Sequence, residues 1–214
     1  MMKSKQLMFW MAVLFVFVGS MIVWAAYRRG VQGSFAGFAA NTGPLDEFQL
    51  IERSGKKFDL TSLQGQVWVA SFFFTACPQE CWRQNLYIKD LVDEYGRQGV
   101  KFISITCDPE RDTPLQLADY AKRLQAHHEH WLFLTGNLEY IQRLGQDKFK
   151  LSVTPTTHSQ KLMLVNPIGD VLGYFSWQEI DEMDLMRTKM DEMLATVKDS
   201  DQNETKTAPE KPTL

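Results

Sequence analysis

The stretch "VWVASFFFTACPQECW", residues 67–82, joins an apolar run to two cysteines, Cys77 and Cys81. The run from Val67 to Phe74 predicts a strand that is buried on both faces of a sheet. A helical pattern follows from Pro78 to Tyr95, where apolar residues recur on one stripe: Ile88, Leu91, Val92 and Tyr95. The two cysteines are therefore expected where a buried strand turns into a helix.

Predicted strands and helices alternate along the rest of the domain. Further strands are expected at 100–106 and 131–134, and residues 161–165 and 171–175 flank "NPIGD" as a hairpin. Helices are expected after two capping residues, Thr113 and Asn137, and over 180–197. This alternation predicts an α/β fold, a thioredoxin-like mixed sheet with flanking helices.

Length and charge limit the possible functions. The chain has 214 residues and a formal net charge of −3, which fits one globular domain with appendages. No basic tract is present, which argues against a nucleic acid as partner. Three cysteines are too few for a disulfide scaffold, and their odd number leaves one thiol over.

The N-terminal segment predicts a membrane anchor. Residues 7–26, "LMFWMAVLFVFVGSMIVWAA", carry no charge and match the roughly 20 residues that cross a bilayer. Cleavage near Val23 and Ala25 is the alternative, but a secretory apolar region is usually only about 7–15 residues long. A short N-terminal stub normally stays in the cytoplasm. We therefore expect the domain in the bacterial periplasm or, alternatively, in the mitochondrial intermembrane space.

Composition divides the chain into four parts. Residues 1–29 form the expected transmembrane helix with its flanks, and residues 30–43, rich in Gly and Ala, form a flexible tether. Residues 44–198 hold the folded domain. Residues 199–214 lack aromatic residues and are expected to be a disordered tail.

The spacing of Cys77 and Cys81 suggests joint chemistry. With Cys77 as helix cap and Pro78 as first helical residue, the helix N-terminus would point at the sulfur and favour a thiolate. Cys81 would lie one turn later on the same face, so that both sulfurs could bind one metal or form a reducible disulfide. An inert structural disulfide is the alternative.

A histidine downstream offers a third ligand. Two thiolates and one imidazole suit copper(I), whereas structural zinc prefers four ligands. His158, in "TPTTHSQKLMLV", is the candidate because it comes just before the strand expected at 161–165. A solvated loop histidine without a ligand role is the alternative.

The motifs together resemble the SCO/SenC family of membrane-tethered, thioredoxin-like copper proteins. They are "FFFTACPQECWRQN", "ISITCDPERDTPLQLADYA", "WLFLTG" and "THSQKLMLVNPIGDVLGYF", in that order. The resemblance implies copper ligation by Cys77, Cys81 and His158. It also implies that the protein delivers copper to, or reduces the cysteines of, the binuclear copper site in cytochrome c oxidase subunit II.

Two positions depart from the family pattern. Trp82 stands where the family usually has a proline, which puts the identity of the partner in doubt. Cys107 stands where an aliphatic residue is usual, and we expect it to be a small buried apolar residue rather than a third soft ligand or a resolving thiol. In "DPERD", residues 108–112, we expect a structural loop in which Arg111 pairs with a carboxylate; a role in orienting the copper loop is the alternative.

Other functions and clusters are less favoured. A membrane-anchored thiol–disulfide oxidoreductase would need only Cys77 and Cys81. A peroxidase of the peroxiredoxin kind has a threonine three residues before its cysteine, but Thr75 precedes Cys77 by two. A solvated patch is expected for three histidines: His127, His128 and His130. Core packing is expected for four methionines at helical spacing: Met183, Met186, Met190 and Met193.

Overall fold

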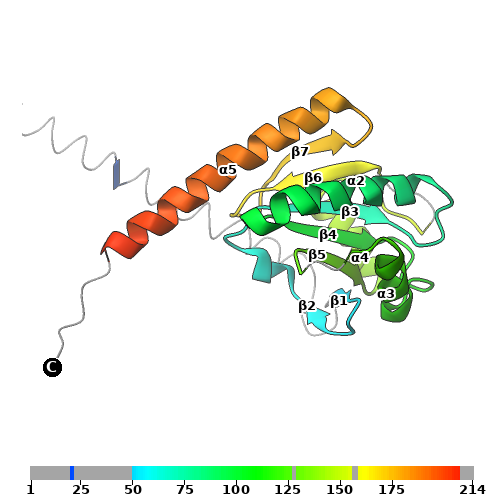
Figure 1. Ribbon diagram of the computed structural model, residues 1–214. Coiled ribbons are helices and arrows are strands. Elements are labelled where there is room, and N and C mark those ends of the chain that lie inside the picture. Colours follow the sequence, from blue (N-terminus) through cyan, green and yellow to red (C-terminus); the bar gives the residue numbers. More distant parts are fainter. Residues whose placement is uncertain (1–19, 22–49, 127–128, 156–158, 208–214) are drawn as a thin grey trace, which may run out of the picture.

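One mixed β-sheet organises the domain (Figure 1). The computed structural model describes residues 20–21, 50–126, 129–155 and 159–207, with side chains as far as Lys198. The strand order is β2-β1-β5-β4-β3-β6-β7. The strands are β1 Leu50–Glu52, β2 Lys57–Phe58, β3 Trp68–Phe73, β4 Lys101–Thr106, β5 Trp131–Thr135, β6 Lys161–Val165 and β7 Val171–Ser176.

The centre of the sheet is parallel. Strand β3 pairs with β4 in parallel, with Phe73 opposite Thr106, and β4 pairs with β5 in parallel. The carboxyl ends of these three strands therefore lie at one end of the sheet, called the carboxyl end below. Strands β6 and β1 join this core antiparallel on either side, which makes the sheet mixed as predicted.

Helices cover both faces of the sheet. Helices α2 (Glu80–Tyr95), α3 (Pro114–Arg123) and α5 (Ile180–Thr207) pack on one apolar cluster, and α4 (Leu138–Arg143) packs on the other. Short turns of 3-10 helix, Leu60–Leu63 and Gly96–Gln98, and of π-helix, Leu144–Lys148, complete the domain. All six residues of β3 are buried, as its apolar run predicted, because successive side chains enter opposite clusters.

The prediction that α2 begins at Pro78 with Cys77 as its cap was wrong. The helix begins at Glu80, and Gln79 is its cap, with a φ of −148° and a ψ of −48° that are not helical. Cys77 and Pro78 stay in the turn that leads from β3 into the helix. The other two predicted caps are confirmed: Thr113 Oγ1 accepts from the Gln116 amide and Asn137 Oδ1 from the Tyr140 amide.

The last helix is longer than predicted. Helix α5 includes the expected residues 180–197 and continues to Thr207, so residues 199–207 of the expected disordered tail are helical. Extending an existing helix requires no new nucleation, and this is why a polar segment can continue it. Met183, Met186 and Met190 are buried, which confirms their predicted place in the core.

The expected membrane anchor lies outside the described residues, apart from residues 20–21. Within the part of the chain that the structure describes, no helix is both long enough and apolar enough to span a membrane. The expected tether at 30–43 and the last seven residues, 208–214, are also outside it.

Candidate metal and redox site

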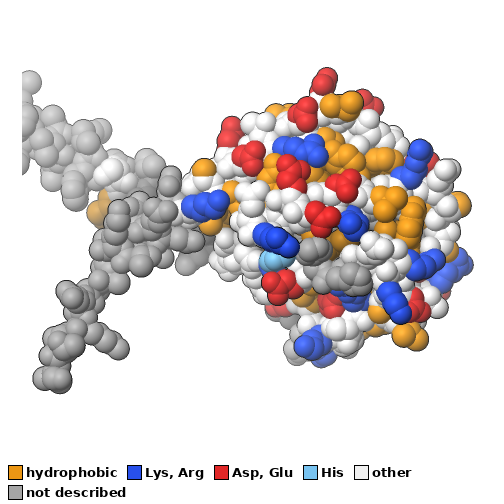
Figure 2. Space-filling view, viewed as in Figure 1, with side chains coloured by type: hydrophobic (Ala, Val, Ile, Leu, Met, Phe, Trp, Pro, Cys, Tyr) orange, Lys and Arg blue, Asp and Glu red, His pale blue; other side chains and the backbone are white. Residues whose placement is uncertain are grey.

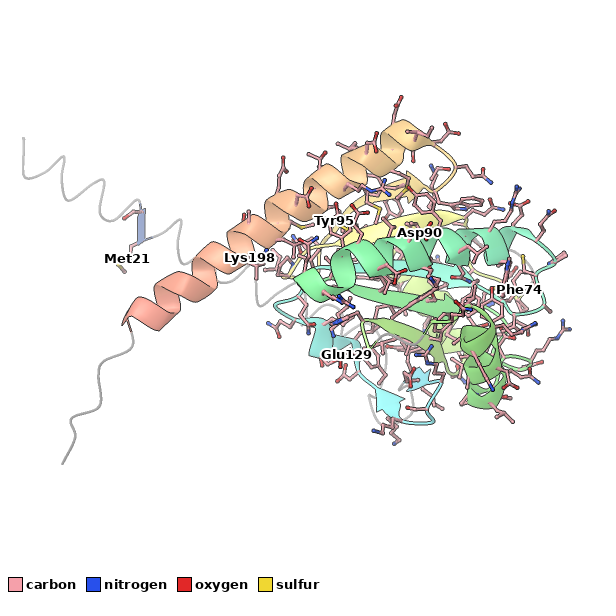
Figure 3. The ribbon with its side chains drawn as sticks, viewed as in Figure 1. Met21, Phe74, Asp90, Tyr95, Glu129 and Lys198 are labelled. Atoms are coloured by element: carbon pink, nitrogen blue, oxygen red, sulfur yellow. The ribbon has the colours of Figure 1, made fainter. Side chains whose placement is uncertain are left out.

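The cysteine loop leaves the carboxyl end of the sheet. Strand β3 ends at Phe73, and the Cys77 amide donates to the Phe74 carbonyl at 3.2 Å, which closes a tight turn. Figure 3 labels Phe74 at this end of the molecule and Lys198 at the opposite end. Open α/β sheets place their reactive groups at the carboxyl ends of strands, so the fold presents both cysteines where chemistry is expected.

Cys77 and Cys81 are in contact. The backbone amide of Cys81 donates to Cys77 Sγ at 3.3 Å, and both cysteines are free thiols. Although Cys77 does not cap α2, its sulfur still receives an amide from the first turn of that helix.

The two thiols differ in accessibility. Cys77 is half-buried, whereas Cys81 is 1% exposed. Burial raises the pKa of the Cys81 thiol above its ordinary value, and its side-chain hydrogen bond with Cys77 raises it further. Cys77 is therefore the sulfur that an incoming group meets first, and Cys81 lies behind it.

Cys107 lies one strand away and is fully buried. Its amide donates to the Phe73 carbonyl at 2.8 Å, and its Sγ lies 3.9 Å from the Pro155 carbonyl oxygen. It packs in the apolar cluster on the opposite face of the sheet from Cys81, and burial raises its pKa to about 12. These contacts fit the predicted buried, apolar role better than that of a soft ligand or resolving thiol.

A buried carboxylate ties the cysteine loop to β4. Asp112 is 0% exposed and accepts from the Thr75 amide at 2.9 Å, from the Thr75 hydroxyl, and from the Thr106 hydroxyl at 2.5 Å. The predicted pairing of Arg111 with a carboxylate is confirmed, because Arg111 forms an ion pair with Asp108 at 3.6 Å. The sequence did not indicate which carboxylate would be buried. Asp112 bonds to the cysteine loop through Thr75, and the alternative role of orienting a copper loop stays a prediction.

An aromatic wall borders the cysteines. Trp82, the first residue after Cys81, packs edge-on against Tyr120 with ring centroids 5.6 Å apart. The Tyr120 hydroxyl accepts from Asn85 Nδ2 at 3.0 Å, and burial raises the pKa of Tyr120. Trp82 therefore packs into an aromatic rim beside the cysteines, at the position where the sequence departs from the family pattern.

His158 lies outside the described residues. The segments on either side of it are described: Pro155 contacts Cys107, and Ser159 Oγ accepts from the Lys161 amide at 3.2 Å. Strand β6 begins at Lys161 and runs antiparallel to β3, so its start lies toward the carboxyl end of the sheet. Among the described residues, no group of three or more His, Cys, Asp or Glu side chains is arranged to hold a metal.

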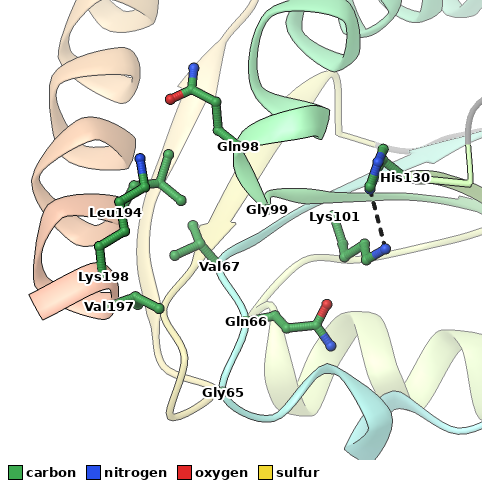
Figure 4. Close-up of a pocket in the computed structure, with 10 residues that line it drawn as sticks. All are labelled: Gly65, Gln66, Val67, Gln98, Gly99, Lys101, His130, Leu194, Val197 and Lys198. Atoms are coloured by element: carbon green, nitrogen blue, oxygen red, sulfur yellow. Dashed lines mark hydrogen bonds between the residues drawn. The ribbon is translucent and has the colours of Figure 1, made fainter. Parts of the chain in front are cut away.

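A separate cavity of about 420 Å³ lies at the opposite end of the sheet, where β3 and β4 begin and α5 passes (Figure 4). Lys101 Nζ and His130 Nδ1 lie 3.3 Å apart in its wall, and no cysteine lines it. The His130 side chain is 20% exposed, so it is more enclosed than the predicted solvated patch. His127 and His128 lie outside the described residues. The cavity is therefore not part of the sulfur site.

The surface carries mixed charge. Figure 2 shows acidic and basic side chains interspersed over the face that α2 and α5 cover. Among the described residues on this face, charges of one sign do not form an extended region, in keeping with the net charge of −3.

Comparison with known proteins identifies the family. The SCO1/SenC family model matches residues 39–195. The SCO1 protein homolog of Bacillus subtilis is 30% identical over 163 residues, which cover 72% of this chain and 81% of that protein.

Two solved structures share the fold. BsSco, a member of the Sco family of cytochrome c oxidase assembly proteins that has a disulfide switch, is 28% identical with a TM-score of 0.61, over 71% of this chain and 96% of its own. Copper-bound yeast Sco1 is 25% identical with a TM-score of 0.51, over 77% and 93%. These likenesses confirm the predicted thioredoxin-like mixed sheet. The chain belongs to the SCO1/SenC family.

Proposed function

We propose that this protein is a copper-binding assembly factor of the SCO type. It delivers copper to, or reduces the cysteines of, the binuclear copper site of cytochrome c oxidase subunit II or a similar copper-accepting protein. The observation that carries the proposal is the contact between two free thiols, Cys77 and Cys81, at the carboxyl end of the sheet. Its context is a family whose members include copper-bound yeast Sco1.

Copper is the cargo in this proposal, and the available donors suit it. Cys77 and Cys81 supply two soft sulfur ligands, which copper(I) prefers. His158 is proposed as the third ligand. Two observations support it: Pro155 packs against Cys107 beside the ends of β3 and β4, and β6 begins at Lys161 toward the same end.

The unequal exposure of the thiols gives each a role. Cys77, half-buried at the surface, would be the first sulfur to gain or release copper during ligand exchange with a partner. The Cys81 amide holds the Cys77 sulfur in place, and the buried Cys81 keeps the second ligand out of water. Trp82 and Tyr120 shape the rim that a partner would meet.

The same thiols support a second candidate, a membrane-anchored thiol–disulfide oxidoreductase without a copper role. The Cys77 thiolate would attack a partner disulfide, forming a mixed disulfide and releasing one partner thiolate, which takes up a proton. The Cys81 thiolate would then attack Cys77 Sγ, releasing the second partner thiol and leaving a Cys77–Cys81 disulfide. Two electrons pass to the partner, and a dithiol reductant must restore the pair before another turnover.

We also propose where the domain works. Residues 7–26 anchor the chain in a membrane, and the domain faces the bacterial periplasm or, alternatively, the mitochondrial intermembrane space. The uncharged, 20-residue length of this segment supports the anchor. An exported location also suits a protein whose thiols pass between free and disulfide forms.

Copper titration tests the proposal. The reduced full-length protein in detergent is titrated with copper(I) against a competing chelator, and about one copper per chain is expected. Cys77→Ser, Cys81→Ser and His158→Ala should each weaken binding by at least about tenfold. Cys107→Ala is the matched control and should leave the affinity unchanged.

The His158→Ala variant distinguishes the two candidate functions. If His158→Ala binds copper as tightly as the parent protein, the imidazole is not a ligand. If the parent protein binds no copper but reduces a partner disulfide, and His158→Ala does so equally well, the oxidoreductase is the function.

A further inference from the structure

Helix α2 carries two adjacent buried amide side chains that differ in their partners. Gln84 and Asn85 are both 0% exposed. Asn85 Nδ2 donates to the Tyr120 hydroxyl at 3.0 Å, and Asn85 Oδ1 accepts from the Ser104 hydroxyl at 3.5 Å. Gln84 Nε2 and Oε1 have no hydrogen-bond partner among the described residues. A buried amide without partners destabilises the folded state, so Gln84 needs an explanation that Asn85 does not.

Gln84 lies beside the second cysteine. It follows Cys81 by three residues, and both belong to the buried face of α2. Side chains three positions apart on a helix are neighbours. Helical side chains generally lean toward the helix N-terminus, which is the direction in which Cys81 lies from Gln84.

Cys81 lies in an apolar environment among the described residues. Cys81 packs in an apolar cluster with Phe73 and Tyr120. A sulfur that carries negative charge in such a cluster is stabilised by a hydrogen-bond donor aimed at it. A neutral amide supplies the donor without adding a charge that would itself have to be buried.

We infer that Gln84 is a positioning residue for Cys81: its side-chain N–H donates to the Cys81 sulfur once that sulfur binds copper(I) or acts as a thiolate in disulfide exchange. This inference rests on the proposed function. Among the described residues neither amide atom of Gln84 has a partner, so the Cys81 sulfur is not in hydrogen-bond geometry with Nε2 in this structure. The side chain would turn toward that sulfur when the sulfur carries negative charge. The protein thus carries a destabilising amide that becomes satisfied in the working state.

Gln84→Leu tests the inference. Leucine removes the amide at similar volume, and it is preferred to methionine because a thioether can itself bind copper(I). The variant should weaken copper(I) binding by about tenfold, the usual effect of losing a hydrogen bond to a charged group. Its copper(II)/copper(I) potential should fall, because a hydrogen bond to a ligand sulfur favours the reduced metal.

Unfolding of the copper-free protein provides the readout that separates a positioning role from a structural one. Because Gln84→Leu removes an unpaired buried amide, its urea midpoint should stay the same or rise while copper binding weakens. Asn85→Leu is the matched control: it should lower the midpoint, because it removes the Asn85 amide that donates to the buried Tyr120 hydroxyl.

The outcomes distinguish this inference from the proposed function. If the parent protein binds copper and Gln84→Leu binds equally well with an unchanged potential, the inference is wrong. A lowered urea midpoint with unchanged affinity would make Gln84 a structural residue instead. If the parent protein binds no copper, the proposed copper role fails. In that case, the rate at which Cys81 attacks a mixed disulfide at Cys77 is measured in the same variants. An unchanged rate in Gln84→Leu overturns the inference.

Discussion

The carboxylate of Asp112 accepts hydrogen bonds from both the backbone amide and the hydroxyl of Thr75, 37 positions earlier in the chain. Thr75 precedes Cys77 by two residues, and the same carboxylate also accepts from Thr106 at the end of β4. One buried side chain thus joins the cysteine loop to the neighbouring strand. Asp112 therefore positions the cysteine loop through Thr75 and not through a hydrogen bond to Cys77 itself.

Asp112→Asn should destabilise the domain by about 1–3 kcal/mol, because an amide nitrogen replaces one of the two carboxylate oxygens that together accept from three donors. Urea unfolding measures this change. Asp108→Asn is the matched control in the same loop, since it removes only the 3.6 Å pair with the exposed Arg111. That control should change the free energy of unfolding by no more than about 1 kcal/mol. Equal effects of the two variants would contradict the assigned role of Asp112.

Cys107 should resist alkylation in the folded protein. Burial raises its pKa to about 12, so at pH 8 its thiolate fraction is far below that of an ordinary thiol. Cys77, which is half-buried, should react first with iodoacetamide. Mass spectrometry of the labelled peptides measures the order, and denaturant should make all three thiols reactive. If Cys107 in the folded protein were labelled as fast as Cys77, its thiol would not be buried in solution.

Glu182 should make stability depend on pH. The backbone amide of Ser176 lowers the pKa of Glu182 in the folded state, and Lys161 lowers it further. A carboxyl group whose folded pKa is depressed stabilises the protein above its unfolded pKa of about 4.3, and this contribution disappears as pH falls through the folded pKa.

Glu182→Gln should therefore lower the urea midpoint at pH 7, and the difference from the parent protein should shrink toward zero as pH falls below about 4. Glu192→Gln, an exposed position on the same helix, is the control and should show no such trend. A difference that stays constant with pH would exclude the carboxylate charge as its cause.

Gly145 should tolerate no side chain. A Cβ at this position would collide with Val153 Cγ2 and would lie 3.1 Å from the Leu151 carbonyl oxygen. Gly145→Ala should therefore destabilise the domain by about 1–3 kcal/mol, as overpacked cores do. Adding Val153→Ala removes the colliding methyl group. The double variant should be more stable than the sum of the single effects predicts, and strict additivity would argue against the collision.

The sequence predicted the central strands and their helices because their apolar patterns are long enough to be periodic. Strand β3 and helices α3 and α4 follow from burial and capping residues alone. Strands β1 and β2 were not predicted, since they span three and two residues and are defined by pairing with distant partners. The start of α2 was misplaced because the pattern does not show how many residues the preceding turn needs.

The sequence predicted the chemistry of the candidate site but not the buried side chains around it. The spacing of Cys77 and Cys81 indicated a paired site, and the structure places them in contact. Neither the burial of Asp112 nor the lack of partners for Gln84 in the described part of the chain leaves a local signal, because each depends on segments brought together only by folding. The role of His158 stays a prediction.

Strand β1 has a consequence for how the domain is presented. It runs antiparallel to β5, with Ile51 opposite Thr135, so the chain enters the sheet at Leu50 from the side where β5 finishes. Cys77 and Cys81 sit on that same side. If the residues ahead of Leu50 hold the domain to a bilayer, the chain leads back to that bilayer from the end of the sheet that carries the thiols.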